Sequence, residues 1–105
     1  MSVFARRLKQ ARKAAGLSQE KLGVLAGIDE MSASARMNQY ERSKHEPDFS
    51  MAERIAKVLS LPVAFFYCDD EQEAKLLAAF HRLDATQKAA LLEQAMDLAG
   101  VDSIG

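Results

Sequence analysis

The chain has 105 residues, of which 49% are hydrophobic, so it is long enough for one globular domain with a buried core. Fourteen Lys and Arg residues stand against fifteen Asp and Glu residues, and the resulting net charge of -1 at first argues against a nucleic-acid partner. No apolar run approaches the roughly 18 residues that a membrane helix needs, and no basic-then-apolar leader opens the chain, so we expect neither membrane insertion nor export.

Apolar residues at helical spacing predict two helices at the start of the chain. The first is expected over residues 2–15, with Gly16 placed to end it. The second is short, because Ser18 is a good N-cap and Gly27 marks its end. The residues expected to face inward are Phe4, Leu8, Ala11, Ala15, Leu22 and Leu25.

A third helix is predicted around residues 33–42, after a connector at residues 29–32. Ser32 and Ser34 are both acceptable N-caps, so the start of this helix stays open between them. At 100° per residue one side gathers Ala33, Met37 and Tyr40, with Glu41 at its edge.

Two more helices are expected after a loop at residues 43–48, where Pro47 disfavours helical geometry in the residue before it. Ser50-x-x-Glu53 has the pattern of a capping box and is predicted to open the fourth helix. Pro62 suits the first turn of a short fifth helix. The buried residues expected here are Ile55, Val58 and Leu59, followed by Phe65 and Phe66 in the fifth helix.

The last part of the chain predicts two further helices. The acidic stretch Asp69-Asp70-Glu71 favours the positive end of a sixth helix, and Asp84-x-x-Gln87 is a capping box for a seventh. Their inward residues are expected to be Leu76, Phe80 and Leu83, then Leu91, Leu92, Ala95, Met96 and Ala99. This wide apolar face has two interpretations, either more core for a small domain or a hairpin that dimerises.

The sequence therefore predicts an all-α protein. We expect a five-helix domain at residues 1–68 and a two-helix extension at residues 69–105 that serves as a dimerisation element.

Charge is distributed unevenly along the chain. Residues 1–47 carry a net charge of +4 and residues 48–105 a net charge of -5. Such a split arises by chance in some small proteins, but it also provides the local basic patch that a polyanion recognises.

A motif with matches at many positions begins in the basic region, residues 1–47, and continues to Leu59. It runs Arg12-x-x-x-Gly16-Leu17-Ser18-Gln19-x-x-Leu22-x-x-x-Ala26-Gly27-Ile28, continues as Tyr40-Glu41-Arg42-x-Lys44-x-x-Pro47, and ends with Ile55-Ala56-x-x-Leu59. Over roughly residues 4–67 this pattern resembles the xenobiotic-response-element family of bacterial and phage regulators, the small lambda-repressor/Cro-like helix-turn-helix proteins. The resemblance implies a five-helix DNA-binding domain whose third helix enters the major groove.

The polar face of the third helix supplies the expected base contacts. Asn and Gln pair with adenine, Arg pairs with guanine, and a small Ala meets a thymine methyl. An ordinary solvated helix face is the competing interpretation. The base-contacting residues we expect are Ser34, Ala35, Arg36, Asn38 and Gln39.

The resemblance also implies phosphate contacts and an internal ion pair. Arg12 and Glu41 match a pair that typically bridges the first and third helices, with two separate surface charges as the alternative. The residues expected to contact phosphate are Ser18, Gln19, Arg42, Lys44 and His45.

The chain departs from the family pattern in two places. Eleven residues separate Ile28 from Tyr40, about four more than is usual, and we expect the extra residues to lengthen the connector at residues 29–32. Ser43 stands where the family usually has a glycine with positive φ, a conformation that serine adopts at some cost.

Other chemistry is not indicated. His45 and His81 are 36 residues apart and lack metal-ligand spacing, and we expect neither a metal site nor a cofactor. The single cysteine, Cys68, fits a reducing cytoplasm and is either an apolar filler or a redox sensor. We predict no enzyme and no small-molecule ligand.

The function expected from the sequence is that of a cytoplasmic, sequence-specific transcriptional regulator. It would bind a double-stranded DNA operator as a homodimer, most simply as a repressor. The alternative is a protein-interaction or antitoxin-like module that uses the C-terminal helices.

Overall fold

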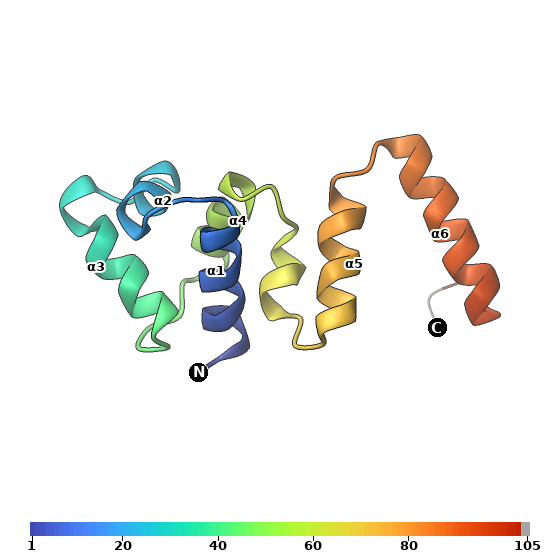
Figure 1. The fold of residues 1–105 in the computed structure, drawn as a ribbon, viewed down its shortest axis with the longest axis horizontal. Coiled ribbons are helices and arrows are strands. Elements are labelled where there is room, and N and C mark those ends of the chain that lie inside the picture. Colours follow the sequence, from blue (N-terminus) through green and yellow to red (C-terminus); the bar gives the residue numbers. More distant parts are fainter. Residues whose placement is uncertain (104–105) are drawn as a thin grey trace.

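The computed structural model describes residues 1–103, and helices are the only regular secondary structure in this part of the chain (Figure 1). The all-α prediction is confirmed. Six α-helices and one 3-10 helix follow one another as α1 (Val3–Ala14), α2 (Gln19–Leu25), α3 (Glu30–Glu41), α4 (Phe49–Val58), η1 (Val63–Tyr67), α5 (Glu71–His81) and α6 (Ala85–Ala99).

One hydrophobic core joins α1, α2, α3, α4 and η1. The inward residues predicted for the first and third helices are buried, except Ala15, which is exposed. In the second helix Leu22 is buried as predicted, whereas Leu25 is half exposed. The largest fully buried apolar side chains are Leu8, Leu22, Met37, Ile55 and Phe66. The core therefore holds α1 to α4 and η1 in fixed positions, α5 adds only Ala74 to it, and α6 adds no buried residue.

Side chains that cap helix N-termini decide where most helices begin. The Ser18 hydroxyl accepts from the Lys21 backbone N–H at 3.0 Å, and the capping box between Asp84 and Gln87 is present, both as predicted. The capping box at Ser50-x-x-Glu53 was a wrong prediction. Asp48 is the cap instead: its carboxylate accepts from the Met51 backbone N–H at 2.8 Å, and Ser50 lies inside the first turn of α4.

The third helix begins one turn earlier than the sequence indicated. Neither Ser32 nor Ser34 is its cap, because the Asp29 carboxylate accepts from the Met31 backbone N–H at 3.0 Å and α3 starts at Glu30. Residues 30–32 are therefore helix and not connector. The four extra residues lengthen α3 and leave the turn before it short.

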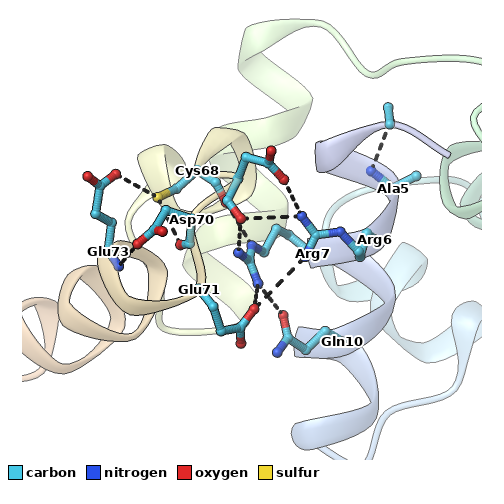
Figure 2. A network of polar contacts seen from close by, with 10 residues as sticks. Ala5, Arg6, Arg7, Gln10, Cys68, Asp70, Glu71 and Glu73 are labelled. Carbon is cyan, nitrogen blue, oxygen red and sulfur yellow. Dashed lines mark hydrogen bonds and ion pairs between the residues drawn. The ribbon is translucent and has the colours of Figure 1, made fainter.

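Arg7 fastens α5 to the domain (Figure 2). Its side chain is completely buried, and its guanidinium donates to the backbone carbonyls of Cys68 and Asp69 at 2.8 and 2.9 Å. It also donates to the Glu71 carboxylate at 3.0 Å and lies over the Phe65 ring. Because a buried cation has to be paired, the start of α5 is held against α1. The acidic stretch at residues 69–71 thus joins the two parts of the molecule.

The last helix is attached much more loosely. The only buried residue of α5 is Ala74, and no residue of α6 is buried. The prediction that Leu76, Phe80 and Leu83 face inward was wrong for Leu76, which is exposed, while Phe80 and Leu83 are partly buried. Figure 1 places α6 at the end of the molecule opposite α3. The apolar face of α6 therefore adds nothing to the core of this chain.

None of the helices in the described part combines the length and the apolar run that crossing a bilayer requires.

Acid should weaken the Arg7 contact. The hydrogen bond and the charge of Arg7 lower the pKa of Glu71, so the stability that this pair adds is present above the ordinary glutamate pKa and is lost as the pH falls through the lowered value. Glu71→Gln should therefore unfold at lower urea than the parent chain at pH 7, and the difference should shrink below about pH 4. Glu93→Gln, at an exposed position of α6, is the matched control. If the difference in urea unfolding between Glu71→Gln and the parent chain did not change with pH, the pairing of Glu71 with Arg7 would not be the source of this stability.

Candidate nucleic-acid interface

A buried carboxylate fixes the third helix against the first two. The Glu41 side chain is 3% exposed, and its oxygens accept from Arg12 Nε at 2.6 Å and from Arg12 Nη2 at 3.1 Å. Gln19 Nε2, from the first turn of α2, donates to the same carboxylate at 3.2 Å. Arg12 also donates to the backbone carbonyl of Leu17 at 2.8 Å. Three helices therefore meet at one bidentate ion pair, and the orientation of α3 follows from it.

The face of α3 opposite its buried residues is polar and open to solvent. Ala33, Met37 and Tyr40 are buried, which turns the other side of the helix outward. Of the five residues expected to read bases, Ser34, Ala35, Arg36 and Gln39 are exposed and Asn38 is half-buried. Asn38 Oδ1 accepts from Gln19 Nε2 at 3.3 Å, so the start of α2 lies next to the middle of this face.

The residues expected to contact phosphate fall into two groups. Ser18 and Gln19 stand at the N-terminus of α2, where backbone N–H groups and the helix dipole favour an anion. Arg42, Lys44 and His45 are exposed just after the C-terminus of α3. Gln19 contacts Asn38 and Glu41, so both groups lie near the C-terminal half of α3, beside its polar face.

A serine with positive φ shapes the loop after α3. Ser43 has a φ of 61°, the left-handed conformation for which glycine is favoured. Its hydroxyl accepts from the Ser2 backbone N–H at 2.8 Å. This hydrogen bond ties the loop to the start of α1 and offsets part of the backbone strain.

The longer α3 also packs unusually close to α2. A Cβ atom added at Gly23 would lie 2.8 Å from the Ala33 Cβ, shorter than real contacts of this kind. Only glycine at position 23 therefore allows the N-terminal half of α3 to approach α2 this closely.

Residues 3–64 match the model of a helix-turn-helix domain, which covers more than half of the chain. The chain belongs to the helix-turn-helix family. In helix-turn-helix proteins the first helix of the motif crosses the DNA backbone and the second enters the major groove, and the two helices of the motif correspond here to α2 and α3.

Individual relatives agree with this assignment. The crystal structure of the transcriptional regulator BswR is 43% identical and has a TM-score of 0.84, with coverage of 97% of this chain and 100% of that one. Two uncharacterised HTH-type transcriptional regulators, from Sinorhizobium medicae and Rhizobium meliloti, are each 33% identical over 63 residues, or 60% of this chain. The matched region makes up only 42% of each of those two proteins, so the likeness to them concerns the helix-turn-helix part alone.

Two features of this helix-turn-helix chain were not foreseen from its sequence. Arg7 lies on the inward stripe of α1 between Phe4 and Ala11, and a cation at such a position is a sign that a buried partner exists. The first turn of α3 was missed because Asp29 was assigned to a connector, although aspartate is as good a cap as serine.

Cys68 belongs to the polar network around Arg7 and not to the polar face of α3. Burial and the neighbouring Glu73 carboxylate raise the pKa of the Cys68 thiol. This keeps the thiol protonated and favours the packing role over that of a redox sensor.

The ion pair between Arg12 and Glu41 should contribute measurably to the stability of the domain. Arg12→Ala leaves the buried Glu41 carboxylate without its main partner, which should lower the free energy of unfolding by about 3–5 kcal/mol. Arg6→Ala is the matched control, because it breaks the exposed pair with Asp69 and should cost about 0–1 kcal/mol. Urea unfolding followed by circular dichroism measures both variants, and equal losses would contradict the role given to Arg12.

Proposed function

We propose that this protein is a sequence-specific DNA-binding transcriptional regulator that reads the major groove with α3. Occupying an operator is sufficient to block a promoter, so we propose repression, in the cytoplasm. The proposal involves no cofactor, no catalysis and no small-molecule ligand.

The observation that carries the proposal is the polar face of α3 together with the way it is held. Base readout requires short hydrogen-bonding side chains at fixed positions, because each contact discriminates between bases only while its geometry is preserved. Asn38 and Gln39 supply amide groups, and the buried pair of Arg12 and Glu41 fixes the helix that carries them. An ordinary solvated face would need no such support.

Positive charge beside the C-terminal end of this face supports the same assignment. Arg42 and Lys44 follow the last turn of α3, and the N-terminus of α2 lies beside Asn38 and Glu41 of the same half of the helix, so both are placed to reach the DNA backbone at the edge of a groove entered by α3. These contacts would supply affinity that depends on salt and not on sequence.

Self-association is proposed for the C-terminal helices. A 15-residue helix with no buried residue gains little stability from its own chain. Leu98 of α6 is 83% exposed, and Leu92 is 53% exposed. Between α5 and α6 lies an apolar groove lined by Glu73, Leu76, Leu77, Phe80, Leu91, Leu92 and Ala95.

A second copy of the chain presents the same apolar surface and would cover this groove with a two-fold interface. Two DNA-binding domains linked in this way match a two-fold operator whose half-sites are separated by a whole number of helical turns. The same α5–α6 face could instead bind a different protein, as in a protein-interaction module. The oligomeric state of the chain therefore decides between self-association and a different partner.

Base readout predicts a difference between two kinds of substitution. Gln39→Ala should relax the base preference at one operator position by about 1–3 kcal/mol, whereas Lys44→Ala should weaken binding to all sequences alike and flatten its salt dependence. The operator is found by selecting bound DNA from a random pool, and affinities are then measured by fluorescence anisotropy between about 50 and 200 mM salt. An equal loss on every sequence for Gln39→Ala would contradict base readout.

Self-association through α6 predicts the behaviour of a charged substitution. Leu92→Glu places a carboxylate in the groove and should convert the dimer to a monomer in sedimentation experiments, since a buried unpaired charge is strongly unfavourable. Ala90→Glu introduces the same charge on the same helix outside the groove and should leave the dimer intact. A parent chain that sediments as a monomer would instead favour a different protein as the partner of this face.

A further inference from the structure

The extra turn of α3 carries the most exposed large apolar side chain in the described part of the molecule. Met31 is 92% exposed, although a flexible apolar side chain gains nothing from contact with water. Its backbone N–H is held by the Asp29 carboxylate, so the residue lies in a formed helical turn and not in a loose connector.

Met31 continues the polar face of α3 toward the tip of the helix. Met31, Ala35, Asn38 and Arg42 are separated by four, three and four residues, so they form a single stripe along the helix. Ala33, Met37 and Tyr40 occupy the opposite, buried side. A ligand that lies along this stripe and contacts Asn38 therefore also contacts Met31.

We propose that Met31 is a specificity-determining residue that contacts the C5-methyl group of a thymine in the major groove. This inference rests on the proposed function. The first residues of a recognition helix are the ones that typically reach base edges, and the thymine methyl is the apolar group presented in that groove. The unbranched thioether of methionine adapts well to such a contact.

The position of the thymine follows from helix geometry. Seven residues separate Met31 from Asn38, which is about 10 Å along the helix axis and about three base-pair steps along a groove that the helix follows.

The acidic residues next to Met31 are compatible with this placement. The Asp29 carboxylate is engaged with the helix N-terminus, and Glu30 lies about 100° around the helix from Met31, toward the packed side.

The test uses the full chain and replaces single thymines of the selected operator with uracil, which removes only the C5-methyl group. One such replacement, about three base pairs from the base read by Asn38, should weaken binding of the parent chain about four-fold, the factor for one methyl group removed from an apolar contact. Met31→Ala should bind the unmodified operator about four-fold more weakly and show no further loss with uracil. Met31→Leu should retain both the affinity and the sensitivity to uracil.

Ser32→Ala is the control in the same turn, and it should leave the selected motif and the uracil effect unchanged. Because Met31 makes no core contact, circular dichroism should show all variants to be folded. A Met31→Ala chain that selects the same motif and keeps the uracil effect would overturn the inference while leaving the proposed function intact. A parent chain that selects no motif would overturn both.

Discussion

The orientation of α3, and with it the placement of its polar face, depends on one buried negative charge. The Glu41 carboxylate lies near the end of α3 and is almost completely removed from water, so it is tolerated only with Arg12 of α1 beside it. Gln19 of α2 adds a third connection. This pairing allows one rotation of α3 about its axis, and that rotation turns Ala33, Met37 and Tyr40 into the core and the polar stripe toward solvent.

A second buried charge has the corresponding role for the C-terminal helices. Arg7 holds the backbone at Cys68 and Asp69 and the Glu71 side chain, so α5 starts at a fixed place on the DNA-binding domain. Beyond α5 the attachment ends, and α6 keeps its apolar face open. The DNA-binding domain is thus closely packed, whereas α6 adds no buried residue to its core.

The parts of this architecture that depend on local signals could be predicted from the sequence. The spacing of Leu8, Leu22, Met37 and Ile55 determined which sides of the helices are buried, and Ser18 and Asp84 determined two helix starts. The start of α3 could not be chosen in this way, because Asp29, Ser32 and Ser34 are equally good caps and the close approach of Ala33 to Gly23 is a tertiary contact. Likewise, the apolar spacing of α6 predicts an apolar face, but it does not tell whether that face packs against this chain or against another one.

The contacts show which of the basic side chains are paired within the molecule and which remain exposed. Arg6 and Arg7 belong to the positive N-terminal region, but both are paired with the acidic start of α5, so part of the positive excess is used within the molecule. Arg36, Arg42 and Lys44 remain exposed on or beside α3. A chain that is nearly neutral overall can therefore present a cationic surface where the polar face lies.

The central claim, that α3 lies in the major groove, is tested most directly by methylation protection on the selected operator. Dimethyl sulfate modifies guanine N7 in the major groove and adenine N3 in the minor groove. The bound protein should protect guanine N7 within each half-site and leave adenine N3 reactive there. Protection of adenine N3 with guanine N7 still reactive would contradict it.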